Sequence, residues 1–399
     1  MMRFSSNIQN LGTETAFKVS MEANSLLKSG KKIYPFHLGD INIETPKIIR
    51  DATTMYMNDN RNGYCPSEGV MKLREVLSND IGEKRSIKYG PENVVVQPGG
   101  KPTIWKFLAS IMERGDEVLY PNPGYPIYES QINYQGGVPI PYNYVDNQNS
   151  FVIDIEKLKS SISNNTVAII YNNYQNPTGA SSSIAEIEAI ANICIENDLW
   201  VLSDEAYYEI RYSSKPPISI ASLPGMKERT VILYTFSKRF AMTGWRVGAS
   251  IGPKKIVKHI AKLNINDESC TNHFIQCALA SVMDKVDKDA KSILDKLKLR
   301  RDICVKLLNS IEGLSLLTPD STFYLYLNVG ELMENKNIID LEKFRINVLK
   351  NTGVAFCTRN HFGSLNTRKD ENYIRLAYSG INSKAIKEGL ISFKNWIEN

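Results

Sequence analysis

The chain has 399 residues, 42% of them hydrophobic and 23% charged, and its formal net charge is +5. A chain of this length predicts two packed domains rather than one small core, and the composition is typical of a globular enzyme. The sequence shows no apolar secretion signal and no run of 18 apolar residues, so neither export nor a membrane span is expected. We therefore expect a cytoplasmic protein without a membrane partner.

The charged residues, cysteines and histidines form no pattern that predicts a nucleic-acid or metal site. The longest basic cluster has helical spacing over residues 254–262 and predicts a solvated helix face rather than a nucleic-acid contact. The six cysteines contain no CxxC pair, and the four histidines are dispersed. We expect reduced thiols and no bound metal.

Between residues 90 and 250, short apolar runs alternate with amphipathic helical patterns. One such helical pattern runs through residues 104–112 and stops at Gly115. Apolar strands separated by helices are typical of an α/β fold with a mostly parallel central sheet and helices on both faces. In such sheets, ligands bind at the carboxyl ends of the strands. The predicted strands are 93–97, 116–121, 166–172, 199–204, 230–235 and 248–252.

After residue 252 the pattern is helical, with a long charged amphipathic stretch over 287–311. Strand-like runs return at 322–329, 353–356 and 373–379, which indicates a smaller α+β domain. We expect the N-terminal segment to complete that domain. The predicted division is an N-terminal segment 1–46, a large ligand-binding domain 47–288 and a small C-terminal domain 289–399.

Two motifs in the first half of the large domain are candidate ligand contacts. Gly99 and Gly100 lie between a predicted strand and a helix, where backbone N–H groups can bind an anion such as phosphate. An ordinary tight turn is the alternative interpretation of this glycine pair. Tyr125 lies in a loop rich in proline and glycine, where its ring can stack on a planar heterocycle or pack within the loop.

Two further strands end in polar residues that can bind an aromatic heterocycle. Asn176 lies in the run QNPTG, which predicts the start of a helix, and its amide can hydrogen-bond a phenolic oxygen; a simple turn is the alternative. Asp204 ends the strand 199–204, where a buried carboxylate needs a cation such as a protonated pyridine nitrogen. A helix cap is the alternative role of Asp204. Tyr207 lies three residues further on and can bind the same phenolic oxygen as Asn176.

The run TFSKRFAMTGWRVG over residues 235–248 is the most informative segment of the chain. Lys238 follows a predicted strand and has the hydroxyls of Thr235 and Ser237 beside it. Arg246 lies in an apolar stretch, where a guanidinium is costly unless an anion pairs with it. An amine that condenses with an aldehyde, beside a cation that holds a phosphate, is what pyridoxal 5′-phosphate (PLP) requires.

In chain order, the runs GGK, NPTG, SDEAYY, SKRFAMTGWRVG and IRLAYS resemble the motifs of the class I aminotransferases of PLP fold type I. The resemblance covers residues from about 10 to 395, and it is closest to the branch that contains bacterial aspartate and aromatic aminotransferases. It implies PLP as the cofactor and ping-pong transfer of an amino group from an L-amino acid to a 2-oxo acid such as 2-oxoglutarate. It also implies a homodimer with shared sites.

The same resemblance implies a role for each motif residue. Lys238 resembles the lysine that attaches to the cofactor and moves the substrate proton. Asp204 resembles the partner of the pyridine nitrogen, while Asn176 and Tyr207 resemble the ligands of the ring oxygen. Tyr125 resembles the aromatic residue that stacks on the ring. The further implied cofactor contacts, at or beside the phosphate, are Gly99, Gly100, Lys101, Thr235, Ser237 and Arg246.

The resemblance extends to the substrate. Arg375 resembles the arginine that pairs with the substrate α-carboxylate, with a solvent-facing strand arginine as the alternative. Gly39 matches a glycine that lines the same carboxylate, and Tyr125 and Asn176 border it. Tyr64 matches a tyrosine that reaches the phosphate of the neighbouring subunit.

The choice of amino donor is left open by the sequence. Lys101 matches a lysine that can contact a distal carboxylate in similar enzymes, which favours an aspartate-like donor. Glu14 and Ala16 stand where those enzymes have small hydroxyl residues, and Glu14 would repel a distal carboxylate, so neutral, aromatic and basic donors stay possible. A PLP-dependent carbon–sulfur β-lyase is a second alternative, because it shares the scaffold. A transcriptional regulator is disfavoured, because the sequence has no recognition-helix pattern.

Overall fold

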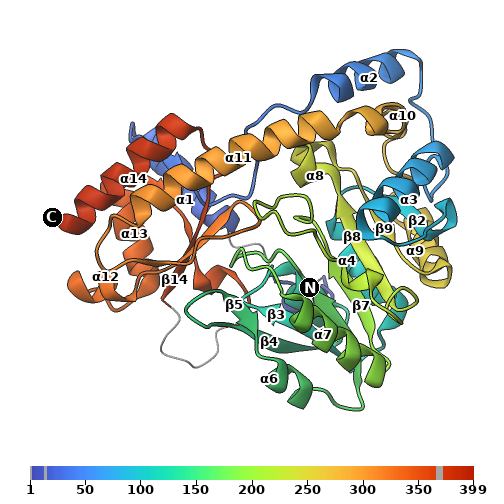
Figure 1. Cartoon of the computed structure of the whole chain (residues 1–399), viewed down its shortest axis with the longest axis horizontal. Helices are drawn as coiled ribbons and strands as arrows, with labels where there is room; N and C mark the ends of the chain where they lie inside the picture. Colours follow the sequence, from blue (N-terminus) through green and yellow to red (C-terminus); the bar gives the residue numbers. More distant parts are fainter. Residues whose placement is uncertain (1, 13–15, 365–371) are drawn as a thin grey trace.

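The computed structural model describes residues 2–12, 16–364 and 372–399. It has an α/β fold in which an eight-stranded, mostly parallel central sheet is packed against helices and adjoins a smaller α+β part (Figure 1). The strand order is β2-β9-β8-β7-β6-β3-β4-β5. The predicted fold class is therefore confirmed.

The central sheet contains every strand that was predicted between residues 90 and 250. Its inner neighbours pair in parallel from β4 through β3, β6 and β7 to β8, whereas β9 and β5 run antiparallel to their partners. The strands are β2 (Val94–Gln97), β3 (Glu117–Asn122), β4 (Val138–Asp146), β5 (Phe151–Ile153), β6 (Thr166–Tyr171), β7 (Trp200–Asp204), β8 (Thr230–Thr235) and β9 (Gly248–Ile251).

Two strands of this sheet, β4 and β5, were missed by the sequence analysis. Pro139 and Pro141 argue against a strand, because proline lacks the N–H group that a strand donates. The part of β4 that holds both prolines pairs only with β3, and β5 pairs only with the end of β4 at Tyr144–Asp146. The prolines therefore lie where no second strand requires their N–H groups.

Helices cover the sheet on both faces. One face packs against apolar residues of α4, α5 and α9, and the other against those of α3, α7 and α10. The helices are α1 (Ala16–Lys28), α2 (Lys47–Asn58), α3 (Met71–Arg85), α4 (Lys101–Ile111), α5 (Ile127–Tyr134), α6 (Ile155–Ser160), α7 (Ile184–Glu196), α8 (Phe236–Arg239), α9 (Lys254–Asn266), α10 (His273–Val282), α11 (Asp287–Leu308), α12 (Gly330–Asn335), α13 (Leu341–Thr352) and α14 (Ser383–Glu398).

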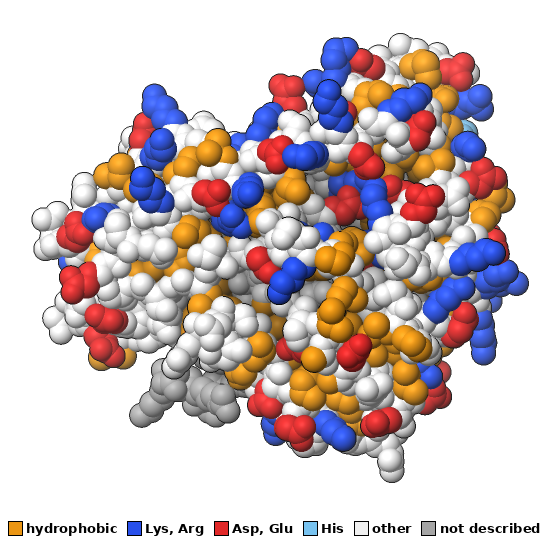
Figure 2. Space-filling model, in the orientation of Figure 1, with side chains coloured by type: hydrophobic (Ala, Val, Ile, Leu, Met, Phe, Trp, Pro, Cys, Tyr) orange, Lys and Arg blue, Asp and Glu red, His pale blue; other side chains and the backbone are white. Residues whose placement is uncertain are grey.

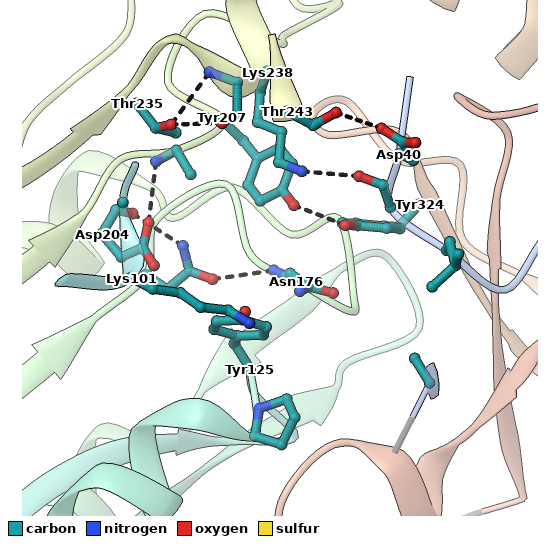
Figure 3. Close-up of a pocket in the computed structure, with 18 of the residues that line it drawn as sticks. Asp40, Lys101, Tyr125, Asn176, Asp204, Tyr207, Thr235, Lys238, Thr243 and Tyr324 are labelled. Carbon is teal, nitrogen blue, oxygen red and sulfur yellow. Dashed lines mark hydrogen bonds between the residues drawn. The ribbon is translucent and has the colours of Figure 1, made fainter. Parts of the chain in front are cut away.

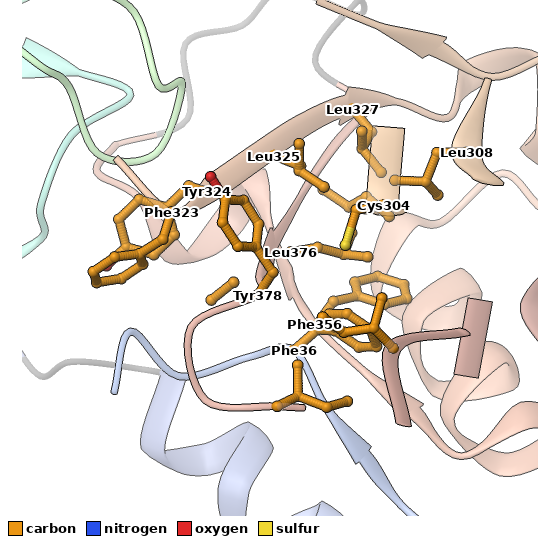
Figure 4. Close-up of a cluster of buried hydrophobic side chains, with 14 of the residues drawn as sticks. Phe36, Cys304, Leu308, Phe323, Tyr324, Leu325, Leu327, Phe356, Leu376 and Tyr378 are labelled. Atoms are coloured by element: carbon orange, nitrogen blue, oxygen red, sulfur yellow. The ribbon is translucent and has the colours of Figure 1, made fainter. Parts of the chain in front are cut away.

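The smaller part combines both ends of the chain. Its antiparallel sheet has the order β10-β11-β14-β13, and the N-terminal strand β1 pairs in parallel with β12. Phe36 from the N-terminal segment packs with Cys304, Leu376 and Phe356 in one apolar core (Figure 4). The strands are β1 (Tyr34–Pro35), β10 (Ser315–Leu316), β11 (Tyr324–Asn328), β12 (Val354–Ala355), β13 (Cys357–Thr358) and β14 (Tyr373–Ala377).

The long helix α11 runs from the central-sheet part of the molecule to the smaller part (Figure 1). The division at residues 46 and 288 stays a prediction. Basic and acidic side chains are interspersed on the face shown in Figure 2. Within the described ranges, no helix is long and apolar enough to cross a membrane, and no group of three or more His, Cys, Asp or Glu is placed to hold a metal ion.

Candidate active site

A cavity of about 670 Å³ lies at the carboxyl ends of the central strands, where α/β sheets bind ligands. Residues from the N-terminal segment, the central sheet and the smaller part all line it (Figure 3). The structure brings most of the predicted site residues together here: Gly39, Gly100, Lys101, Tyr125, Asn176, Asp204, Tyr207, Thr235, Ser237, Lys238, Arg246 and Arg375.

Lys238 is half-buried on α8, a helix of only four residues that directly follows β8. The hydroxyl of Thr235 accepts a hydrogen bond from the Ser237 N–H over 3.2 Å and caps this helix. The Lys238 Nζ donates to the backbone oxygen of Gly39 over 2.8 Å (Figure 3). This contact places the amine where the central sheet and the N-terminal segment meet.

The glycine turn and Arg246 form one edge of the cavity. Gly99 has a φ of +98°, and a Cβ atom there would collide with the Arg246 guanidinium, so the turn requires glycine. Arg246 donates to the backbone oxygen of Thr243 over 2.7 Å and to that of Pro98 over 3.3 Å. Its side chain is exposed, which corrects the expectation of a guanidinium surrounded by apolar residues: Arg246 ends a turn before β9, and only the residues of this stretch from Val247 onward are buried.

Asp204 at the end of β7 is a buried carboxylate, with 6% of its surface exposed. It accepts hydrogen bonds from the Tyr128 hydroxyl over 2.5 Å and from the Ala206 N–H over 3.1 Å. Burial raises its pKa, and those two hydrogen bonds oppose the shift. In the described part of the chain, no Lys, Arg or His forms an ion pair with Asp204. A buried carboxylate in this state suits a cationic ligand.

Two asparagines connect Asp204 with the next loop. Asn172 donates to the backbone oxygen of Asp204 over 2.9 Å, and its side-chain oxygen accepts from the Asn176 N–H over 3.1 Å. The expected helix start at Asn176 is wrong, because α7 begins only at Ile184, after the capping side chain of Ser183. The residues from Asn176 onward form a turn that directs the amide of Asn176 into the cavity.

Arg375 on β14 is a buried arginine, with 4% of its surface exposed. It donates to the side-chain oxygen of Asn176 over 2.9 Å and to the backbone oxygen of His37 over 2.7 Å, while its Nε has no partner. The guanidinium lies 4.3 Å from the ring centre of Tyr324 and 4.6 Å from that of Phe362. No carboxylate of the described residues pairs with this cation, so its surroundings suit an incoming anion.

The histidines beside Arg375 add no positive charge at neutral pH. Burial, together with the nearby charges of Arg375 and Arg345, lowers the pKa of His37 to about 4. Burial also lowers the pKa of His361, which lines the cavity. Arg375 is therefore the cation that attracts an anion at this end of the cavity.

Some functional residues were not predicted from the sequence. Tyr128 and Asn172 contact Asp204, His37 contacts Arg375, and the Tyr324 hydroxyl lies 2.7 Å from that of Tyr207. A Cβ atom on Gly39 would collide with the Tyr324 hydroxyl, which explains the glycine. Only Asn172 had a sequence signal of this kind, at the end of the predicted strand 166–172, whereas Tyr128 lies on α5 and Tyr324 begins β11.

Some predicted residues lie elsewhere. Gly99 supports Arg246 without lining the cavity, and Tyr64 is 87% exposed and does not line it either. Ala16, at the start of α1, lines the cavity, whereas Glu14 lies outside the described residues. Lys101 also lines the cavity, and its Nζ lies 5.7 Å from the centre of the Tyr125 ring.

Comparison with known proteins agrees with this geometry. A family model described as "Aminotransferase class I and II" matches residues 32–393. The chain is 28% identical over 400 residues to an aspartate aminotransferase of Bacillus subtilis, covering 100% of this chain and 99% of the relative. It is also 28% identical to an asparagine–oxo-acid transaminase of Streptococcus mutans, covering 95% of each chain.

Solved structures extend the likeness to three dimensions. An aromatic aminotransferase from Pyrococcus horikoshii superimposes with a TM-score of 0.86 at 27% identity, covering 94% of this chain and 98% of that one. An aspartate aminotransferase from Rhizobium meliloti gives a TM-score of 0.92 at 24% identity, covering 100% and 99%, and shows the shared fold. Together with the family match over nearly the whole chain, these likenesses show that the chain belongs to the class I and II aminotransferases and is a transaminase.

Proposed function

We propose that this cavity binds PLP and transfers the amino group of an L-amino acid to a 2-oxo acid. The observation that carries the proposal is one arrangement: the Lys238 amine, the buried Asp204 carboxylate and the buried Arg375 guanidinium line a single cavity. Asp204 suits a cationic ring nitrogen, and Arg375 suits a substrate carboxylate.

The residues present fit PLP. Asp204 would hold the pyridine nitrogen, and Tyr125 would stack on the ring. Asn176 and Tyr207 would bind the ring oxygen. The phosphate would lie at the N-terminus of α4, beside Arg246. The other proposed phosphate contacts, at or beside the group, are Gly99, Gly100, Lys101, Thr235 and Ser237.

When bound, PLP supplies an aldehyde for covalent attachment and a ring that stabilises negative charge at the substrate α-carbon. Lys238 would hold PLP through its Nζ, and its free amine would take the proton from the substrate α-carbon as general base and deliver it as general acid. Arg375 orients the α-carboxylate so that the α-hydrogen faces Lys238. Because one Arg375 serves both carboxylates, the 2-oxo acid product leaves before the acceptor binds, which is a ping-pong order.

We propose an aspartate-like amino acid as the amino donor and 2-oxoglutarate as the acceptor. The Bacillus subtilis relative is named an aspartate aminotransferase, and Lys101 lines the cavity near Tyr125. Phe17, Leu38 and Phe362 also line it, and these apolar contacts keep neutral or aromatic donors as the alternative.

The test is to add single L-amino acids to purified protein with PLP and measure the matching 2-oxo acids. We expect the fastest conversion with aspartate and no product without PLP. Equal rates with aspartate and alanine would overturn the proposed donor. If protein freed of PLP forms as much 2-oxo acid as protein with PLP, the proposal that PLP is the cofactor is overturned. Pyruvate and ammonia from a cysteine conjugate, without a 2-oxo acid acceptor, would indicate the lyase alternative.

Arg375→Ala is expected to lower kcat/KM for amino-acid donors by about 10²- to 10³-fold, because losing one partner of a buried charge pair costs about 2–5 kcal/mol. Most of the loss should be a higher KM, since Lys238 stays in place. Steady-state kinetics with aspartate check this. Arg375→Lys keeps the positive charge but lacks the planar guanidinium, so its kcat/KM should lie between those of the wild type and Arg375→Ala. An unchanged KM in Arg375→Ala would contradict the proposed role.

We further propose a homodimer in which Tyr64 reaches the partner's phosphate. Tyr64 is 87% exposed, and Met55, Met57 and Met71 on the flanking helices are exposed as well. Exposed apolar side chains of this kind suit a protein interface. Light scattering would test the dimer, and a monomer at assay concentration would refute it. The cytoplasmic location also stays a prediction.

A further inference from the structure

Arg239, the residue after Lys238, is a buried arginine that the proposed chemistry does not use. Its surface is only 4% exposed. The two residues lie side by side on the four-residue helix α8, and the Lys238 side chain lines the cavity while Arg239 is absent from its lining. Arg239 therefore acts on the outer side of the helix that carries the reactive amine.

Three carboxylates from three separate segments surround this guanidinium. Its Nη1 lies 3.0 Å from Asp80 of α3, its Nε pairs with Glu209, and its Nη2 pairs with Asp287 at the start of α11. Figure 1 shows α8 next to the N-terminal end of α11. A planar guanidinium has N–H groups in fixed directions, so it can hold several carboxylates at once, which an ammonium on a flexible stem does less well. Its Nη1 and Nη2 donate hydrogen bonds to Asp80 and Asp287, whereas its contact with Glu209 is an ion pair without a hydrogen bond.

The helix itself cannot fix the orientation of Lys238. A helix of four residues has too few internal hydrogen bonds to be stable alone, so tertiary contacts must hold it. The N-terminal cap from Thr235 fixes one end. Arg239 is the last residue of the helix, and its ion pairs fix the other end.

One of these ion pairs leads directly to the rest of the proposed site. Glu209 lies five residues after Asp204 and two after Tyr207, on the loop that follows β7. Burial raises the pKa of Glu209, and the Arg239 charge opposes that shift. The Arg239–Glu209 pair thus joins the helix that carries Lys238 to the loop that follows Asp204 and carries Tyr207.

We propose that Arg239 is a positioning residue, which holds the Lys238 amine in register with Asp204 and Tyr207 through its pair with Glu209. The inference rests on the proposed role of Lys238 as the amine that attaches to PLP. The ion pairs with Asp80 and Asp287 hold the same guanidinium against α3 and α11. Lys84, which pairs with both Asp80 and Asp287, keeps this charge cluster close to neutral.

The test compares Arg239→Lys, Arg239→Met and Glu209→Gln with the wild-type holoenzyme. We expect kcat to fall by about tenfold or more in both Arg239 variants, because a small displacement of a reacting group has that effect. The KM for aspartate should stay within about threefold, because Arg375 is untouched. Attachment of PLP to Lys238 should give a visible absorbance band. This band should also develop more slowly when PLP is added to each cofactor-free variant. Glu209→Gln should also lower kcat and slow the development of the absorbance band. It tests the proposal even if an Arg239 variant fails to fold.

Arg345→Met is the matched control. Arg345 is equally buried, at 2% exposed, and pairs with Glu22 and Glu342 over 2.7 Å each, on helices other than α8. Its loss should lower the unfolding temperature without slowing the reaction of Lys238 with PLP.

Two results would overturn the proposal. If kcat and the rate of band development stay within about twofold of wild type in Arg239→Lys and Glu209→Gln while the unfolding temperature falls, Arg239 is only structural. If the wild-type protein itself develops no band with PLP, the proposed function fails, and this role of Arg239 fails with it.

Discussion

Replacing Lys238 by alanine is expected to lower transamination by at least about four orders of magnitude, because the same amine attaches to the cofactor and transfers the α-proton. The fold should be preserved, since Lys238 is only half-buried and its Nζ donates to a backbone oxygen, that of Gly39, rather than to a buried carboxylate. The measurement is the rate of 2-oxo acid release from aspartate in the presence of PLP, together with the unfolding temperature.

Two further variants make this result specific. Lys238→Arg keeps the positive charge but cannot lose its proton, so it should be as inactive as the alanine variant. Lys32→Ala removes an exposed lysine that pairs with Glu388 far from the cavity, and it should keep wild-type activity. Near-normal turnover in Lys238→Ala would remove the basis of the proposed mechanism.

Asp204→Asn is expected to lower activity by about 10²- to 10³-fold, because breaking a buried charge pair costs about 3–5 kcal/mol. The amide keeps the size of the side chain and can still accept a hydrogen bond, but it has no charge for the ring nitrogen of PLP. Steady-state turnover checks this loss. Asp198→Asn is the control, because that carboxylate is 96% exposed and pairs with Arg229 away from the cavity.

Although Asp204→Asn should lower activity, it should raise the stability of the cofactor-free protein at neutral pH. Burial raises the pKa of Asp204 from its ordinary value of 3.8, so the folded state binds this proton more tightly than the unfolded state. Stability is then lost as pH rises from about 4 through the raised pKa. At pH 7 the cofactor-free Asp204→Asn protein should unfold about 2 °C above wild type, and the difference should vanish below about pH 4.

Added PLP should reverse that order by stabilising the wild type more than the variant, since only the wild type offers a carboxylate to the ring nitrogen. Thermal unfolding with and without PLP at pH 4 and pH 7 measures both effects. A cofactor-free Asp204→Asn protein less stable than wild type at pH 7 would contradict the view that this carboxylate is buried at a cost.

The sequence was sufficient to predict the fold class and to identify many of the residues that line the cavity. Asp204, Asn176 and Lys238 each follow an apolar run, and the carboxyl ends of parallel strands meet at one edge of a sheet. Strand position along the chain therefore predicts proximity in space. The same reasoning missed β4, where Pro139 and Pro141 interrupt the strand pattern, and it misplaced the start of α7.

What the sequence by itself determined was the order of the motifs and the kinds of chemical group they bring: an amine and a carboxylate at strand ends, and a guanidinium within a later strand. Only the tertiary structure decided which groups are buried and what they contact. Tyr128 of α5 donates a hydrogen bond to Asp204 of β7. Arg239 pairs with carboxylates from α3, the loop after β7 and α11. Local patterns report which face of an element is apolar, whereas contacts between distant segments depend on how those elements pack, which no single run of residues specifies.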